Sequence, residues 1–202
     1  MTILQPKHRS PRRLSRRMLC AALACATPAL HAATFTWLGL GNTYDWNDNT
    51  GNWDSSSADP YPGLLSQHDN VVLGAVSQRF TIRLYSLIAI DGITVQAPYT
   101  LNILGNLIVQ QPVTGSGLIV NLTGGFLSFE SSASAGSTTI TADQNSELDF
   151  FNTATAASAT IDSAGILTFR DSSTAPNASV SLSGGNLDVS EKGTEEFSVS
   201  NE

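Results

Sequence analysis

Cysteine, basic residues and long apolar runs are scarce in this sequence of 202 residues. The two cysteines, Cys20 and Cys25, both lie near the N-terminus, so the remaining chain can form no disulfide. The longest apolar run, from Met18 to about Leu30, is shorter than the roughly 20 residues that a helix needs to span a bilayer. No segment has the periodicity of an amphipathic helix. These absences argue against a disulfide scaffold, a membrane-spanning helix and a helical bundle.

The N-terminal segment has the three-part organisation of a secretory signal peptide. Six of the ten basic residues precede the apolar run, and the small residues Ala32 and Ala33 follow it. We therefore expect residues 1–32 to be a signal peptide, cleaved after Ala32, which directs the chain out of the cytoplasm. The adjacent Arg16 and Arg17 leave a twin-arginine export signal open as an alternative to the general secretory route.

The segment that follows the expected cleavage site is strongly acidic. It retains four basic residues against all 17 acidic residues, which gives a formal charge of −13. Binding to nucleic acid or to an anionic membrane surface depends on patches of Lys and Arg. The sequence therefore predicts no nucleic-acid partner and no direct insertion into a membrane. About 170 residues are enough for one sizeable core, and a single elongated domain is the simplest interpretation.

A repeat of 19 to 21 residues runs through the C-terminal half. Each unit contains a leucine, one intervening residue, and then Phe or Val. Both apolar positions advance by steps of 20, 21, 19 and 20 residues through five units: Leu107-Ile108-Val109, Leu127-Ser128-Phe129, Leu148-Asp149-Phe150, Leu167-Thr168-Phe169 and Leu187-Asp188-Val189. Single apolar residues with mostly polar neighbours precede the five units at a spacing of 19 to 21 residues, and Val199 follows the last unit at the same spacing; the five are Leu101, Val120, Ile140, Ile161 and Val180. Because side chains alternate between the faces of a strand, we expect both sets to point inward.

One coil of about 20 residues cannot bury its own apolar face, whereas stacked coils with strands about 4.8 Å apart can. The repeat therefore predicts an all-β fold, a parallel and right-handed β-helix, over residues 99–202, with the chain ending inside a sixth coil. Residues 33–98, which include three tryptophans, are expected to form an N-terminal cap and the first strands. A β-sandwich is the alternative, although it has no need for one residue class at a constant offset.

A column of glycines accompanies the repeat. Glycine lies two residues before four of the leucines, and Ser146 takes its place once; the glycines are Gly105, Gly125, Gly165 and Gly185. Because glycine accepts positive φ without a Cβ clash, we interpret this column as one tight corner, with positive φ, on every coil.

Several motifs resemble the passenger segments of autotransporters and their β-strand repeats. The resemblance covers nearly all of the chain after the signal peptide and rests on these segments: Thr36-Trp37-Leu38-Gly39, Asp45-Trp46-Asn47, Gly51-Asn52-Trp53-Asp54, Asp69-Asn70-Val71-Val72 and Tyr99-Thr100-Leu101. It implies a β-helix that is carried through the outer membrane by a C-terminal barrel. The sequence ends at Ser200-Asn201-Glu202 without such a barrel. We therefore expect a fragment, a truncated product, or a passenger released by another route.

The resemblance and the repeat together predict a non-enzymatic, structural or adhesive stalk at the cell surface or outside the cell. The periplasm is the expected location if no barrel is supplied. The expected partners are a host-cell or matrix surface, or further copies of the chain, and no cofactor is predicted. The alternatives are a carbohydrate-active β-helix enzyme and a non-functional fragment of a longer autotransporter.

Three sets of residues are candidate chemical sites, and none is predicted to be catalytic or to bind metal. His68 and Asp69 adjoin many serines, but no Gly-Asp-Ser-Gly or Gly-x-Ser-x-Gly nucleophile motif is present, so a loop histidine is the better interpretation. The segment from Asp45 begins like an EF-hand loop, but Thr50 replaces its glycine and Ser56 its final glutamate. Its Asp and Asn side chains are instead expected to form turns.

The third set is the column of residues between the paired apolar positions. Asp149 and Asp188 share this outward column with Ser128 and Thr168, and two acids could serve a polysaccharide-cleaving enzyme. No basic or aromatic sugar platform accompanies them, so we interpret them as solvated acids that keep the face soluble. An acid at Thr168 should then be tolerated, whereas Phe150→Asp or Leu167→Asp should unfold the coils.

Overall fold

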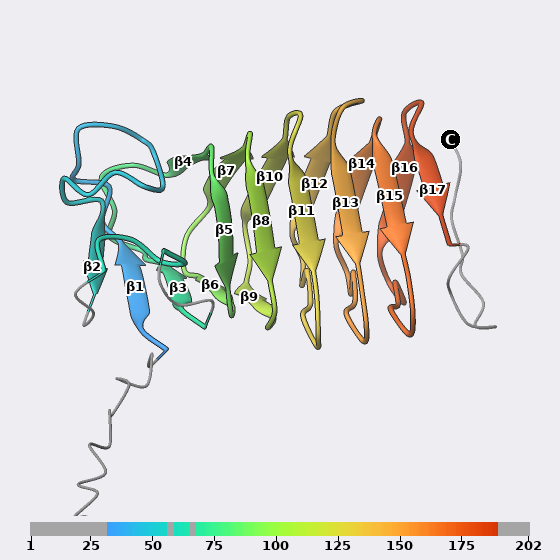
Figure 1. Cartoon of the computed structure of the whole chain (residues 1–202), viewed down its shortest axis with the longest axis horizontal. Coiled ribbons are helices and arrows are strands. Elements are labelled where there is room, and N and C mark those ends of the chain that lie inside the picture. The colour runs from blue at the N-terminus through green and yellow to red at the C-terminus, as the bar shows by residue number, and fades with distance from the viewer. Residues whose placement is uncertain (1–31, 56–58, 65–67, 190–202) are drawn as a thin grey trace, which may run out of the picture.

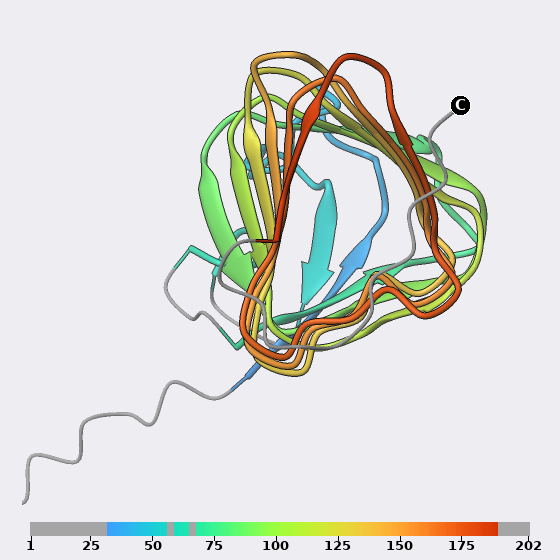
Figure 2. The ribbon, with the colours of Figure 1, turned by 90° about the vertical axis from the view of Figure 1, so that its right-hand side faces the viewer.

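The computed structural model describes residues 32–55, 59–64 and 68–189. Over these residues the chain forms seventeen strands and no helix, wound into about six coils of about 20 residues (Figure 1). Figure 2 looks along the stack and shows the coils superposed around one shared interior. The fold is a parallel β-solenoid, which confirms the architecture that the repeat predicts.

Two sheets run the length of the solenoid, and every strand pair within them is parallel. Sheet B contains β4 (Thr81–Leu84), β7 (Tyr99–Ile103), β10 (Leu118–Leu122), β12 (Thr139–Ala142), β14 (Thr160–Ser163) and β16 (Ser179–Leu182). Sheet C contains β5 (Leu87–Ile90), β8 (Asn106–Val109), β11 (Phe126–Phe129), β13 (Glu147–Phe150), β15 (Ile166–Phe169) and β17 (Asn186–Asp188). These parallel ladders exclude the β-sandwich, whose sheets are antiparallel.

Sheet A forms the third side of the first coils and continues into the N-terminal end. It contains β1 (Thr34–Trp37), β2 (Trp53–Ser55), β3 (Asn70–Leu73), β6 (Ile93–Val95) and β9 (Val113–Gly115). Only β2 runs antiparallel to its neighbour, β1. In later coils this side is reduced to single bridges that join Ser134, Thr155 and Thr174. Because β4, β5 and β6 already form a coil, the solenoid ladders extend upstream of residue 99.

The three tryptophans cluster at the N-terminal end of the core. The ring of Trp53 lies 4.9 Å from the ring of Trp37 and 4.9 Å from that of Trp46, in edge-to-face geometry. Each indole N–H donates to a backbone carbonyl oxygen. Trp37 donates to Arg79, Trp46 to Pro62, and Trp53 to Trp46. The rings therefore cover the first coils without leaving a polar atom unsatisfied, as expected for a cap.

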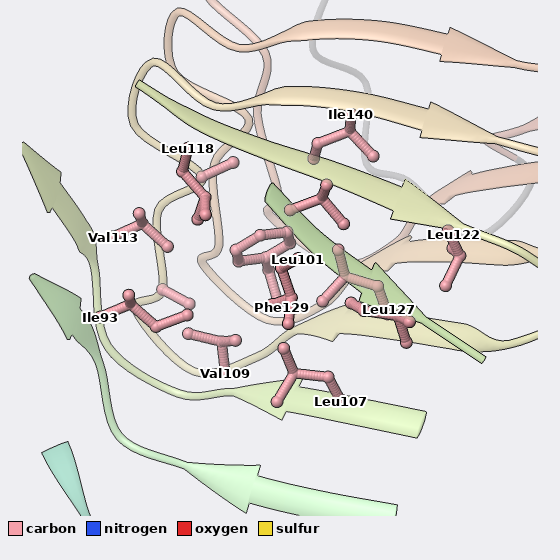
Figure 3. Close-up of a cluster of buried hydrophobic side chains, with 14 of the residues drawn as sticks. Ile93, Leu101, Leu107, Val109, Val113, Leu118, Leu122, Leu127, Phe129 and Ile140 are labelled. Carbon is pink, nitrogen blue, oxygen red and sulfur yellow. The ribbon is translucent and has the colours of Figure 1, made fainter. Parts of the chain in front are cut away.

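Apolar ladders fill the interior (Figure 3). The expected inward positions are buried in each coil from β7 to β15, and the core thins at β17, where Leu187 is half-buried. Phe150 stacks between Phe129 and Phe169, with ring centroids 5.0 and 4.8 Å apart. The assigned register is therefore confirmed for these coils. Val199, the expected start of a sixth unit, lies outside the described residues.

The glycine column marks a repeated corner, but the predicted reason for it is wrong. Positive φ occurs at Gly124 and Gly184, one residue earlier, and not at Gly125 or Gly185. At the column itself a Cβ would meet backbone of the preceding coil, for example the carbonyl oxygen of Ser86 at 2.5 Å for Gly105. Glycine is thus required by the close approach of two coils rather than by its own dihedral angles.

The corner with serine is longer than the others. Four residues, Asp143 to Ser146, separate β12 from β13, whereas two or three separate the strands at the other corners between sheets B and C. The Ser146 hydroxyl donates to the Leu122 carbonyl oxygen at 2.9 Å and bonds the Asp143 carboxylate at 2.6 Å. The extra residue makes room for the serine side chain. The Ser146 hydroxyl then provides a hydrogen bond to the Leu122 carbonyl of the neighbouring coil.

Ala157 has a left-handed conformation that glycine adopts at the matching place one coil earlier. Its φ is 51°, and that of Gly136 is 61°. A left-handed conformation costs an L-residue about 1 kcal/mol, partly offset by the greater chain entropy that glycine loses on folding. We expect Ala157→Gly to raise the free energy of unfolding by about 0.5 kcal/mol in urea titrations. The reciprocal Gly136→Ala should lower it, because its Cβ would also lie 2.6 Å from the Val113 carbonyl oxygen; equal effects of the two changes would contradict this account.

Candidate functional site

The outer face of sheet C carries the acids that the sequence singles out. Its central column, which follows from the strand register, consists of Ala89, Ile108, Ser128, Asp149, Thr168 and Asp188. Ser128, Asp149 and Thr168 are only 0%, 2% and 1% exposed, and Asp188 is half-buried. The prediction of a solvated acidic column is therefore wrong. The residues two places before and after these three are more exposed than they are, so the column forms the floor between two rows of longer side chains: Phe126, Glu147 and Ile166 on one side and Glu130, Phe151 and Arg170 on the other.

Direct contacts bind one side of this floor together. The Ser128 hydroxyl donates to the Glu130 carboxylate at 3.3 Å. The Arg170 guanidinium lies 5.2 Å from the centre of the Phe151 ring, two residues along the chain from Asp149. Thr168 itself is buried. It is therefore not the exposed position that the expected tolerance of an acid requires. An aspartate there would be buried beside Asp149, and like charges that close repel.

Asp149 is a buried carboxyl group in an unfavourable electrostatic environment. Burial, with further repulsion from Glu147 and Asp188, raises its pKa to about 6 against the opposing effects of a Thr168 hydrogen bond and Arg170. Its Oδ1 atom has no hydrogen-bond partner among the described residues. A buried, unpartnered carboxylate oxygen destabilises the fold, and such groups occur preferentially where a protein has a function to perform.

We expect Asp149→Asn to stabilise the protein at neutral pH. A carboxyl whose pKa is raised on folding binds its proton more tightly in the folded state, so stability falls as pH rises from about 4 through 6. Allowing for screening by solvent, the loss at pH 7 is on the order of 1–2 kcal/mol. Asparagine removes that loss. In urea unfolding, the free energies of unfolding of the variant and the wild type should therefore differ at pH 7 and converge near pH 4.

Asp54→Asn is the control for this measurement, because Asp54 is an exposed residue of β2. It should leave the pH dependence of the unfolding free energy unchanged. A wild-type pH profile that Asp149→Asn does not alter would show that Asp149 titrates normally in the folded protein.

A pocket of about 350 Å³ opens at the N-terminal end of the same outer face. Gly63 and Leu64 line it from the segment before β3. The other lining residues come from three successive coils of sheet C, either from the strands themselves (Leu87, Ala89 and Ile108) or from the residue after a strand (Gln110 and Glu130). Sequence reasoning missed this pocket. The signal that could have indicated it is the small residue Ala89 in an outward column between larger neighbours.

His68 and Asp69 contact different groups. Asp69 is fully buried, and its carboxylate accepts from the backbone N–H groups of Ala33 at 3.1 Å and Gly63 at 2.9 Å. His68 is exposed, and its Nδ1 lies 3.2 Å from Oδ1 of Asp91. The structure thus gives Asp69 a role in anchoring the first strand and the loop at Gly63.

The segment that resembles an EF-hand forms turns, as predicted. The Asp48 carboxylate accepts from the hydroxyls of Thr43 and Thr50, and these bonds hold its pKa well below the usual range. The Asn52 side chain accepts from the Gly41 N–H at 2.8 Å and donates to the Asp45 carbonyl at 3.1 Å. A second pocket, of about 370 Å³, is lined by residues of this segment and by Tyr85. Of its two acids, Asp48 accepts from the two threonine hydroxyls and Asp45 forms an ion pair with Arg83 at 3.0 Å.

Within the described ranges, no three His, Cys, Asp or Glu side chains are grouped so that they could hold a metal ion. The same residues include no helix of the length and apolarity that a membrane span requires. No protein-family model, curated protein or solved structure matches the chain. Functional inference therefore depends on the geometry of the solenoid and of its outer faces.

Proposed function

We propose that this chain is a secreted or surface-exposed β-helical stalk of the autotransporter-passenger kind, with a structural and adhesive role and no catalytic activity. The observation that carries the proposal is the uninterrupted stack of coils around one core, closed at its N-terminal end by tryptophans. Such a stack is stiff, because each coil is held to the next by two complete backbone ladders.

The N-terminal segment and the charge support the location. A signal peptide over residues 1–32 would place the coils outside the cytoplasm. The strongly acidic remainder, with 17 acidic residues against four basic ones, favours a role away from nucleic acid and anionic lipid. The expected partners are accordingly a host-cell surface, an extracellular matrix, or another copy of the chain.

Export and adhesion can be tested separately. The full chain should be produced in a Gram-negative host, and the N-terminal residue of the exported product determined. Cleavage after Ala32, and appearance of the product outside the cytoplasm, would support the location; retention of an intact leader in the cytoplasm would refute it. The purified product should then bind cultured cells or matrix proteins, or self-associate in sedimentation experiments. Inert behaviour in all of these assays would refute the adhesive role.

A carbohydrate-active enzyme is the second candidate, and the raised pKa of Asp149 favours it. A carboxyl group that retains its proton near neutral pH can act as a general acid toward a glycosidic oxygen. Asp188 lies in the same column two coils away, about 10 Å by the strand spacing, with Thr168 between them. This separation is near the upper end of the range in inverting glycosidases. Polysaccharide cleavage that is abolished by both Asp149→Asn and Asp188→Asn would favour the enzyme over the stalk.

A further inference from the structure

The pocket at the N-terminal end of sheet C has the dimensions and lining of a ligand site. Its volume of about 350 Å³ lies within the range of pockets that hold small molecules. Ala89, only 8% exposed, provides a floor between higher side chains, and Leu87 and Leu64 are 63% and 43% exposed. Exposed leucines beside a pocket offer apolar surface that no other described part of the chain covers.

The pocket includes Ala89 and Ile108, the first two residues of the column that leads to Asp149. Glu130 lines the pocket and bonds Ser128, which is the register neighbour of both Ile108 and Asp149. Three strand spacings separate Ala89 from Asp149, a span of about 14 Å. The unpartnered Oδ1 of Asp149 lies at the far end of this span. The pocket residues and Asp149 are thus aligned along the solenoid axis, and the alignment ends at a buried acceptor that lacks a donor among the described residues.

The charges along this surface exclude an anionic ligand. Glu130, Glu147, Asp149 and Asp188 lie on or beside the central column, and among the described residues Arg170 is the cation that acts on Asp149. An anion would therefore face net repulsion. A peptide is also disfavoured on the face of the sheet, because β8, β11, β13 and β15 each pair with a strand on both sides and cannot accept a further strand.

We infer that this surface binds a neutral, extended oligosaccharide. The C–H faces of sugar rings would pack on Leu64, Leu87 and Ile108, and sugar hydroxyls would bond Gln110 and Glu130. The inference builds on the proposed adhesive function and names the class of ligand that one face of the stalk would hold.

Two substitutions test the site, and one serves as a matched control. Ile108→Trp places a large ring in the pocket, whereas Gln110→Ala removes a polar contact from a half-buried position with little effect on folding. Ile119→Trp is the control, because Ile119 is also an outward isoleucine but lies on β10 of sheet B and is 42% exposed. Circular dichroism and urea unfolding should establish that all three variants fold.

The probes are neutral hexasaccharides of glucose, mannose and N-acetylglucosamine in several linkages, with oligogalacturonate as the anionic comparison, measured by calorimetry and ligand-observed NMR. At least one neutral hexasaccharide should bind, Ile108→Trp should weaken it by about tenfold or more, and Gln110→Ala by about threefold or more. Ile119→Trp should bind as the wild type does. The inference fails if no neutral probe binds, if oligogalacturonate binds more tightly, or if neither pocket variant weakens binding.

Failure of the site and failure of the adhesive function give different results. If Ile108→Trp leaves cell or matrix adhesion intact and no neutral probe binds the wild type, the stalk adheres through another face and only the site is wrong. If a hexasaccharide binds in the pocket but the full chain adheres to nothing, the site is correct and the adhesive function is wrong.

Discussion

Replacement of Phe150 by aspartate is expected to unfold the coils on both sides of it at neutral pH. Phe150 is fully buried and stacks on an equivalent ring in each neighbouring coil, 5.0 and 4.8 Å away. Loss of the ring alone costs about 3–5 kcal/mol, and the new carboxylate would have no partner in an apolar interior. Because a whole domain is stable by only about 5–15 kcal/mol, the two effects together leave little stability. The measurement is urea unfolding followed by circular dichroism.

Two further variants isolate the cause. Phe150→Leu keeps an apolar side chain and should lose only the aromatic stacking and part of the volume, a cost of about 1–2 kcal/mol. Thr139→Asp places the same charge on an exposed position of β12 and should be nearly neutral. If Phe150→Asp and Thr139→Asp proved equally stable, the inward register of sheet C would be wrong.

The second large effect is expected from Gly125→Ala, although Gly125 has an ordinary φ. A Cβ there would overlap the Gly105 carbonyl oxygen and lie 3.3 Å from that of Ile103, both in the preceding coil. Backbone cannot move aside as a flexible side chain can, so the two coils must separate at this corner. We expect a loss of about 3 kcal/mol or more in the free energy of unfolding.

Gly124→Ala is the matched comparison, one residue away. Gly124 has a φ of 68°, but a Cβ there would meet nothing within 4 Å. Its replacement should therefore cost only the left-handed conformation of alanine, which after the entropy offset is about 0.5 kcal/mol, as for the reverse change at Ala157. A larger loss for Gly124→Ala than for Gly125→Ala would restore positive φ as the reason for the glycine column.

The stacked architecture followed from the sequence because it depends on a regular offset. Leucine and phenylalanine at constant spacing are required only where equivalent residues of successive coils meet, so the spacing alone placed Leu148 and Phe150 in the core. The glycine column was located equally well. Its cause was not, because a sequence reports that Cβ is absent without distinguishing a dihedral requirement from a close approach of backbone.

The outer face was predicted less well, for two physical reasons. Alternation along a strand separates inward from outward side chains. It does not show whether longer neighbouring side chains bury an outward residue, and the prediction that Asp149 is solvated is wrong for that reason. The pocket was missed because Gly63 and Leu64 reach it from a segment more than twenty residues before β5 in the chain. Contacts of that kind have no periodic signature.

The antiparallel direction of β2 has a consequence for how molecules of this protein meet. An open parallel rung is a template on which an identical coil of another molecule can continue the same ladder, as in fibre growth. At the N-terminal end the last strand, Trp53–Ser55, is only three residues long and points the opposite way. A strand that arrives with the direction of the stack would be antiparallel to β2, so it cannot continue the parallel hydrogen-bond ladder at this edge. Sheet A therefore resists extension by another coil at this end, through the direction of a single short strand, whereas sheets B and C end there at the parallel strands β4 and β5.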